Sequence, residues 1–251
     1  MGLADLHIHT IYSYDGTCSV PAVLKHVKTK TNLNVIAITD HDAIRGALEA
    51  LELAPKYQLE VIPGCEVSSR DGHVLALFIQ KPIPPHLSLK ETVLRVGEQG
   101  GICIAAHPTA PGTSSLDFKD IWNALQDPDV RRILVGVESF NGGLVYTRQN
   151  PVVEKQSQSL PLAQVGNSDA HILRMIGQGA TLFSGNTAQE LRYALEAKTT
   201  SVYKGNGLNG INVMRDYLPH FFLRKFGWVT HNHHPQDPLR LERLSRVMSN
   251  Q

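Results

Sequence analysis

The sequence predicts an α/β fold of repeated strand–helix units, and a (β/α) barrel is the simplest arrangement of them. Between residues 1 and 204, short runs rich in β-branched residues alternate with amphipathic segments of roughly 10–15 residues, the pattern of parallel strands joined by helices. No change of composition marks a second domain-sized unit. A chain of 251 residues with 42% hydrophobic content can bury a substantial core. Periodicity alone does not separate a barrel from a doubly wound open sheet, so the open sheet stays as the alternative.

The predicted strands are these β-branched runs, and several of them end in a polar residue. In chain order they span residues 4–8, 34–39, 59–66, 73–79, 101–106, 133–139 and 162–167. A helix is predicted to begin at Ser19, where a hydroxyl cap and Pro21 in the first turn favour a helix start. Further helices are predicted over 43–54, which Pro55 ends, over 88–99, and from Asn186 or Thr187 to Ala197.

The chain is expected to divide into a barrel over residues 1–204 and a helical extension over residues 205–251. The extension begins with three glycines and continues with the aromatic stretch DYLPHFFLRKFGW. We expect one or two helices here, separated by Pro235 and Pro238 and packed on the outside of the barrel. The aromatic stretch could instead form a homo-oligomer contact or a membrane-surface helix. Packing on the barrel is favoured over a homo-oligomer contact, and the membrane is the least favoured alternative.

The charge and cysteine content restrict the partners and the compartment. The 24 basic and 23 acidic side chains give a net charge of +1, so no global field attracts nucleic acid or an anionic membrane. The chain has neither an apolar run of roughly 20 residues nor a secretory signal, and its three cysteines are scattered. We therefore expect a cytoplasmic protein without a disulfide framework.

The residues that carry chemistry gather where the predicted strands meet their loops. His7 and His9 alternate at the end of the first strand and so point to the same side, which is a metal-ligand spacing. In a parallel α/β fold the carboxyl ends of the strands share one rim. The other candidates at these junctions are Asp15, Asp40, His41, Asp42, Glu66, His73, His107, Asp169 and His171.

This set of side chains predicts a cluster of divalent ions. Imidazoles together with carboxylates suit Zn²⁺, Mn²⁺ or Fe²⁺. About nine ligands are too many for one ion of four to six coordination, so we expect two or three ions. Such a cluster binds a phosphoryl group and lowers the pKa of bound water, which makes a nucleophile available near neutral pH.

Six separated motifs resemble the polymerase and histidinol phosphatase (PHP) family of metal-dependent phosphoesterases. They are DLHIHT, SYDGT, AITDHD, PGCEVSS, AAHP and NSDAH, in the family order from Asp5 to His171. The resemblance implies a distorted seven-stranded, TIM-like barrel with a trinuclear metal centre at its C-terminal rim. It assigns His7, His9 and Asp169 to the first ion, Glu66 as the bridge to the second, and His73 and His107 to the second. Asp15, His41 and His171 would hold the third ion.

The resemblance also implies attack of a metal-bridging hydroxide on a phosphate ester. Asp40 is expected to orient an imidazole through a hydrogen bond, and Asp42 either does the same or is the candidate for handling protons. Arg45 and Arg174, on rim loops, are candidates for binding phosphate oxygens.

The expected substrate is a small phosphorylated metabolite or nucleotide, with a phosphatase favoured over a phosphodiesterase. The alternatives are an exonuclease acting on nucleic acid ends and a non-catalytic module stabilised by metal. A carbon–nitrogen hydrolase of the amidohydrolase kind is disfavoured. Such enzymes commonly bind metal through a carboxylated lysine at the end of a strand, and no lysine stands at the end of a predicted strand here.

Overall fold

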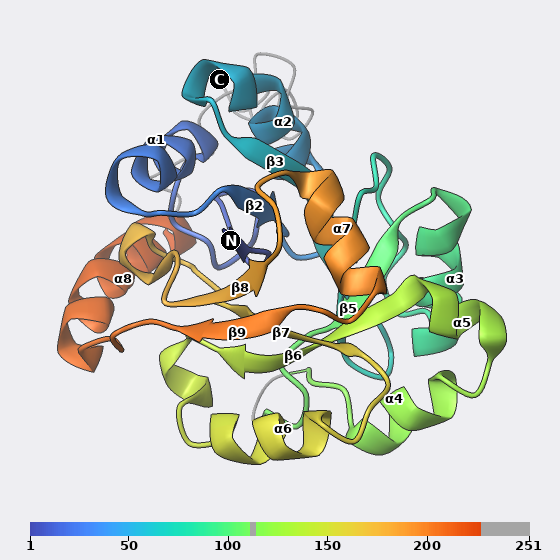
Figure 1. Ribbon diagram of the computed structural model, residues 1–251. Helices are drawn as coiled ribbons and strands as arrows, with labels where there is room; N and C mark the ends of the chain where they lie inside the picture. The colour runs from blue at the N-terminus through green and yellow to red at the C-terminus, as the bar shows by residue number, and fades with distance from the viewer. Residues whose placement is uncertain (111–113, 227–251) are drawn as a thin grey trace, which may run out of the picture.

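A single sheet of nine strands forms the centre of the computed structural model, which describes residues 1–110 and 114–226 (Figure 1). The strand order is β7-β6-β5-β4-β3-β2-β1-β8-β9. The strands are β1 (Gly2–Asp5), β2 (Val35–Ile38), β3 (Glu60–Ser68), β4 (His73–Leu77), β5 (Ile102–Ala105), β6 (Leu134–Asn141), β7 (Ala163–Asn167), β8 (Gly179–Phe183) and β9 (Ser201–Lys204).

The first seven strands curve into a barrel, as the sequence predicts. The chain beyond β7 pairs with the chain beyond β1 through a parallel bridge between Ile8 and Ala170. In this bridge the His9 amide donates to the Ala170 carbonyl at 2.9 Å, and the Ala170 amide donates to the His7 carbonyl at 3.1 Å. These bonds bring the two ends of the seven-stranded sheet together, which rules out the open sheet.

The sheet is mixed, so the expectation of parallel strands throughout is wrong. β4 is antiparallel to both β3 and β5. Only four residues separate β3 from β4. A parallel crossover needs a dozen or more residues, whereas a turn this short can only form a hairpin. The Ser69 hydroxyl accepts hydrogen bonds from the amides of Asp71 and Gly72, and Gly72 takes a positive φ of 141°.

The strands β8 and β9 were not predicted. They form an antiparallel hairpin, and β8 pairs antiparallel with β1. The Thr181 hydroxyl of β8 donates to the Gly166 carbonyl of β7 at 2.9 Å. The hairpin thus covers the part of the barrel where β1 and β7 do not pair with each other.

Helices surround the barrel on the outside (Figure 1). They are α1 (Val20–Lys30), α2 (Arg45–Tyr57), α3 (Leu89–Glu98), α4 (Phe118–Ala124), α5 (Pro128–Ile133), α6 (Asn150–Ser157), α7 (Ala188–Glu196) and α8 (Gly210–Lys225), with short 3-10 helices at Leu144–Tyr146 and Leu173–Met175. Four of them match predicted helices, and α7 has the predicted Thr187 cap, completed by Glu190 as a capping box. Two local expectations are wrong: the Ser19 hydroxyl makes no capping hydrogen bond, and Pro55 lies inside α2 instead of ending it.

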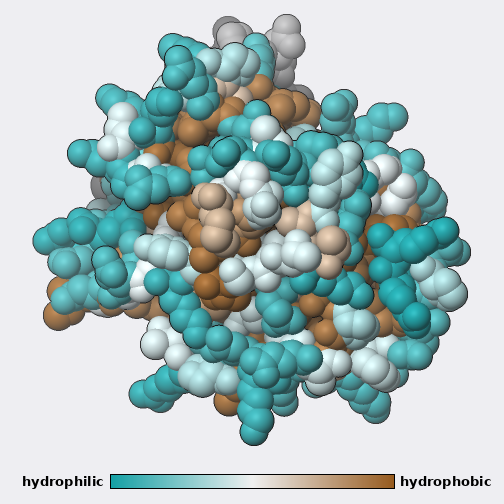
Figure 2. All heavy atoms as spheres, in the orientation of Figure 1, coloured by the Kyte–Doolittle hydropathy of each residue, from teal (hydrophilic) through white to brown (hydrophobic). Residues whose placement is uncertain are grey.

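The helix α7 covers the end of the barrel opposite to His7 and His9. Because Gly2 of β1 pairs with Phe183 of β8, the chain leaving β8 for α7 lies at the amino end of β1. Leu191 and Leu195 of α7 join the apolar cluster formed by one face of the strands. On the face drawn in Figure 2, hydrophilic side chains predominate over the helices and apolar ones lie mostly between them.

Of the predicted extension, the structure describes α8, which follows β9 after a short connection. The predicted break at Pro235 and Pro238 lies outside the described residues. Among the described residues, no helix combines the length and the apolar character that crossing a membrane requires.

Candidate metal centre

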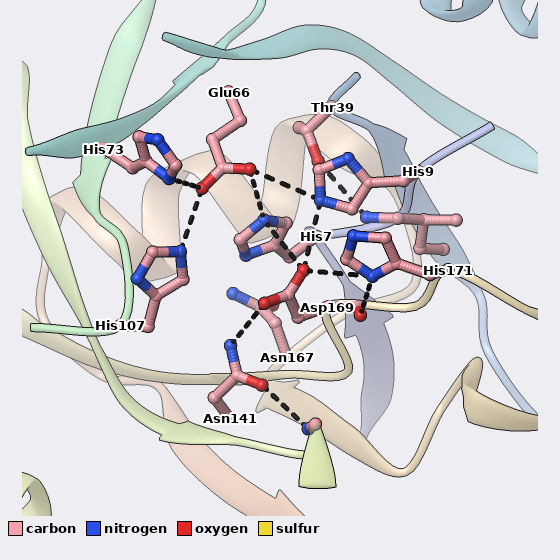
Figure 3. Close-up of polar contacts among 12 residues, drawn as sticks. His7, His9, Thr39, Glu66, His73, His107, Asn141, Asn167, Asp169 and His171 are labelled. Carbon is pink, nitrogen blue, oxygen red and sulfur yellow. Dashed lines mark hydrogen bonds and ion pairs between the residues drawn. The ribbon is translucent and has the colours of Figure 1, made fainter. Parts of the chain in front are cut away.

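The histidines that follow β1 point into the barrel. His7 and His9 are buried, with exposed fractions of 0% and 1%. The His7 Nε2 atom lies 3.1 Å from the Glu66 Oε2 atom and 3.4 Å from the Asp169 Oδ1 atom. The corresponding distances from His9 Nε2 are 3.3 Å and 3.1 Å (Figure 3). Two carboxylates from distant strands therefore converge on the His-x-His pair.

Glu66 of β3 is the centre of this cluster. One carboxylate oxygen, Oε1, lies 2.8 Å from His73 Nδ1 and 2.9 Å from His107 Nε2. The other, Oε2, lies near His7 and His9 and 3.2 Å from His41 Nδ1. Burial opposes ionisation of Glu66, but these imidazoles, led by His7, hold the pKa of the carboxyl well below its usual range. An ionised carboxylate whose two oxygens each face a different set of imidazoles is suited to bridge two ions.

His73 reaches the cluster because β4 is antiparallel. It is the first residue of its strand, so in a parallel strand it would lie at the opposite end of the barrel from His7. The hairpin turn reverses the direction and places the start of β4 beside the carboxyl end of β3, where Ser68 pairs with His73.

A more exposed group lies on one side of the cluster and consists of Asp15, His41 and His171. The Asp15 Oδ2 atom lies 3.0 Å from His171 Nε2 and 3.4 Å from His41 Nε2. The side chains of Asp15 and His171 are 15% and 20% exposed, whereas those of His7 and His9 are fully buried. The cluster is therefore closed at His7 and open to solvent beside Asp15 and His171.

The structure brings all nine predicted ligands together, and their chemistry fits divalent ions. The described residues form four sets, and within each set the ligand atoms lie within 4.8 Å of one another. The sets are His9, Asp15, His41 and His171; His7, His9 and Glu66; His7, His107 and Asp169; and His41, Glu66 and His73. Four buried atoms of these residues lie at ion-pair distance from other members of the cluster but make no hydrogen bond: His7 Nε2, His41 Nδ1, Glu66 Oε2 and His73 Nδ1. Leaving a buried polar atom without a hydrogen bond is costly, and coordination to a cation satisfies such atoms.

The backbone at two of these residues is left-handed. His107 has a φ of 24° and Asp169 a φ of 50°. Non-glycine residues adopt such angles at an energetic cost that the surrounding structure must offset. Each of these residues follows the last residue of a strand by two positions, and its side chain lies in the cluster.

Glu138 of β6 is a member of the site that the sequence reasoning missed. Its Oε1 atom lies 3.1 Å from His7 Nδ1 and accepts from Asn167 Nδ2 at 2.9 Å. Its Oε2 atom accepts from the His107 amide at 2.7 Å and from Asn141 Nδ2 at 3.0 Å. The carboxylate thus contacts the ring of one proposed ligand, His7, and the main chain of another, His107. A charged residue within the apolar run LVGVESF was the signal, because an acid in a buried strand needs partners.

The two aspartates of the TDHD motif make hydrogen bonds to the main chain. Asp40 accepts from the Thr10 amide at 2.6 Å and from the Thr10 hydroxyl at 2.8 Å, so it bonds to the residue after His9 and not, as expected, to an imidazole. Asp42 accepts from the Ser68 amide at 2.7 Å and has a φ of 49°.

The two predicted phosphate-binding arginines have partners within the protein. Arg45, the first residue of α2, lies with its guanidinium carbon 5.8 Å from the centre of the Tyr12 ring. The Arg174 Nε atom lies 2.8 Å from the Asp216 Oδ2 atom of α8. A phosphate group that binds to Arg174 therefore has to compete with the Asp216 carboxylate.

Comparisons with known proteins give the family of the chain. A family model described as the PHP domain matches residues 5–138, and a second, described as PHP-associated, matches residues 147–200. An uncharacterized protein of Methanocaldococcus jannaschii is 37% identical over 147 residues, which are 55% of this chain and 81% of that protein. Another from the same organism is 30% identical over 182 residues, covering 72% of this chain and 70% of the relative.

A solved structure has a similar fold. It is a two-domain protein from Bacteroides vulgatus described as containing a predicted PHP-like metal-dependent phosphoesterase. At 22% identity, the match covers 88% of this chain and 68% of that one with a TM-score of 0.65. The first family model alone spans more than half of the sequence, including most of the proposed ligands. The chain therefore belongs to the PHP-domain family.

Proposed function

We propose that the protein is a metal-dependent phosphoesterase that hydrolyses a phosphate ester of a small metabolite or nucleotide. The observation that carries this proposal is the buried cluster of six histidines and three carboxylates, open to solvent on one side. The two-domain protein from Bacteroides vulgatus, which has a similar fold, is described as containing a predicted PHP-like metal-dependent phosphoesterase. We propose two or three bound ions, with Mn²⁺, Fe²⁺ and Zn²⁺ as the candidates that this mixed set of ligands suits.

The chain's own residues define what the site can do. Divalent ions bound there would supply positive charge for the phosphoryl oxygens and lower the pKa of water. Glu66 and Asp169 are held ionised although burial opposes it, because the imidazoles around them keep the pKa of each carboxyl well below its usual range. Both are therefore ready to bind cations without first losing a proton. The ester would enter beside Asp15 and His171, the most exposed residues of the cluster.

Hydrolysis of two chromogenic esters tests this function. The protein is loaded with Mn²⁺ and assayed with p-nitrophenyl phosphate, a monoester, and bis-p-nitrophenyl phosphate, a diester. We expect metal-dependent release of p-nitrophenol, faster from the monoester. Glu66→Gln should lower kcat/KM at least a hundredfold. Glu154→Gln is the matched control, since Glu154 is an exposed carboxylate whose partner is Lys204.

The other outcomes distinguish the alternatives. Faster release from the diester would favour a phosphodiesterase, and digestion of a short RNA or DNA from one end would favour an exonuclease. A protein that binds metal but hydrolyses none of these substrates would contradict the proposal and support a non-catalytic module.

A further inference from the structure

Tyr146 is a buried aromatic residue that contacts two of the proposed metal ligands. It ends the 3-10 helix Leu144–Tyr146 and has an exposed fraction of 7%. Its ring lies nearly parallel to that of His107, with 5.1 Å between the ring centres and 12° between the planes. Its hydroxyl group makes a side-chain hydrogen bond with Asp169. One side chain therefore reaches an imidazole with its ring and a carboxylate with its hydroxyl group.

The tyrosine is the donor in this hydrogen bond. Although burial opposes it, the imidazoles around Asp169, led by His7, keep the pKa of its carboxyl well below the usual range. Burial, followed by the charge of Asp169, raises the pKa of the Tyr146 hydroxyl well above its ordinary value. The hydroxyl group therefore keeps its proton, and the ionised carboxylate can only accept.

A second uncharged donor reaches the same carboxylate from the chain just before Tyr146. The Asn141 Nδ2 atom donates to the Asp169 Oδ2 atom at 3.3 Å (Figure 3). The other oxygen, Oδ1, lies 3.1 Å from His9 Nε2 and 3.4 Å from His7 Nε2. Donors on the carboxylate restrict its rotation, and the contact at Oδ2 leaves Oδ1 directed at the two histidines.

The chain before Tyr146 holds the ring in this place. The Tyr146 amide donates to the Gly143 carbonyl at 3.1 Å, and the Gly143 amide donates to Asn141 Oδ1 at 2.8 Å. A methyl group on Gly143 would lie only 3.0 Å from Tyr146 Cδ2, so the glycine lets the ring pack against the main chain. Residues 139–146 lie between the two family models, which match residues 5–138 and 147–200. The role of Tyr146 is therefore inferred from these contacts alone.

We propose that Tyr146 is a positioning residue of the metal centre, whose hydroxyl group orients Asp169 and whose ring orients His107. This inference deepens the proposed function and rests on the metal centre that this function requires. Asp169 and His107 belong to one set of converging ligand atoms, together with His7. A hydrogen bond that orients a metal ligand changes metal affinity by roughly 10- to 100-fold. Tyr146 thus raises the affinity for divalent ions through the two ligands that it contacts.

Calorimetric titration of the metal-free protein with Mn²⁺ tests the role of the hydroxyl group. Tyr146→Phe keeps the ring beside His107 and removes the donor to Asp169, so we expect binding to be weaker by roughly tenfold. Tyr146→Leu removes both contacts and should weaken binding further. Tyr193→Phe is the matched control and should bind Mn²⁺ like the wild type, because Tyr193 is an exposed tyrosine of α7, at the opposite end of the barrel. Circular dichroism verifies that each variant is folded.

The visible absorption spectrum of the Co²⁺-loaded protein distinguishes the orientation of the ligands from a general loss of stability. The absorption bands of Co²⁺ depend on the number and geometry of its ligands, so Tyr146→Phe should change them and Tyr193→Phe should not. Excess metal stabilises the folded state, so the spectrum can be recorded even for a variant whose metal-free form has lost stability.

The outcomes separate this inference from the proposed function. Wild-type Mn²⁺ affinity and a wild-type Co²⁺ spectrum in both Tyr146 variants, with the chromogenic esters still hydrolysed, would overturn the inference and leave the phosphoesterase in place. Affinity that depends on Tyr146 in a protein that hydrolyses neither ester would overturn the phosphoesterase and leave the positioning role. A loss of affinity in Tyr146→Leu but not in Tyr146→Phe would overturn the role of the hydroxyl group. A wild-type protein that binds no divalent ion would overturn both proposals.

Discussion

Replacing Glu138 by glutamine should disturb both the stability of the protein and its affinity for metal. The substitution keeps the size of the side chain and changes one acceptor oxygen into an NH₂ donor. Each carboxylate oxygen faces two groups: Oε1 faces His7 Nδ1 and Asn167 Nδ2, and Oε2 faces the His107 amide and Asn141 Nδ2. Whichever oxygen is replaced, the new NH₂ group points at two of these four.

The magnitude follows from these contacts. A buried donor left without an acceptor costs about 1–3 kcal/mol, so two of them should lower the free energy of unfolding by about 2–6 kcal/mol. His7 can relieve one conflict by carrying its proton on Nε2 instead of Nδ1, but that proton would then occupy the atom that faces Glu66 and Asp169. Loss of the hydrogen bond that orients a metal-binding histidine lowers affinity by roughly 10- to 100-fold. We expect a loss of Mn²⁺ affinity in this range.

Urea denaturation of the metal-free protein measures the first effect, and calorimetric titration with Mn²⁺ measures the second. The control is Glu154→Gln, which removes an exposed ion pair with Lys204 and should cost less than about 1 kcal/mol without affecting metal binding. If Glu138→Gln unfolds within about 0.5 kcal/mol of the wild type and binds Mn²⁺ equally well, Glu138 does not hold His7 and His107 as we infer.

Four further predictions concern the contacts around the cluster. Although burial lowers it, hydrogen bonds with Asp169 and Glu66 raise the pKa of His9 to about 10, above its ordinary value of 6.5. This contribution to stability is complete below pH 6.5 and is lost as the pH rises through 10, so the melting temperature of metal-free protein should fall between these values; a flat profile would contradict it. Mn²⁺ binding at pH 7 should also release protons, measurable by calorimetry in two buffers. Gly46→Ala should lower the free energy of unfolding by about 1–3 kcal/mol, because the new methyl group would overlap Asp40 Oδ2 and lie 2.8 Å from Thr10 Oγ1; Gly210→Ala, whose methyl group has room, should have little effect. Arg174→Ala should raise KM or lower kcat without loss of metal, and unchanged kinetics would remove Arg174 from the site.

The candidate ligands could be predicted because the fold concentrates them at recognisable positions. His7, His41, His107 and Asp169 each stand at or just beyond the end of a β-branched run, and such ends meet at one rim of a barrel. His73 stood at the start of a run, where the rule for parallel strands does not apply. It is in the cluster because a four-residue turn reverses β4, a consequence of chain length that the strand pattern alone does not convey.

The support of the site was less accessible to sequence reasoning. Glu138, Asn141 and Asn167 act through hydrogen bonds between β6, β7 and the chain beyond β1, and these depend on register. The pairing of Arg174 with Asp216 brings together residues 42 positions apart in the chain. The hairpin of β8 and β9 was missed because β9 is short and largely exposed, which gives little hydrophobic alternation.

Counting the metal ions bound to each chain tests the central claim most directly. Protein saturated with Mn²⁺, Fe²⁺ or Zn²⁺, freed of loosely held ions by gel filtration and analysed by elemental mass spectrometry, should retain two or three ions per chain. Glu66→Gln should retain fewer, because the two carboxylate oxygens of Glu66 face different sets of imidazoles and glutamine keeps only one of these oxygens. Fewer than two ions per wild-type chain under metal-replete conditions would contradict the assignment of the nine residues to a multinuclear centre.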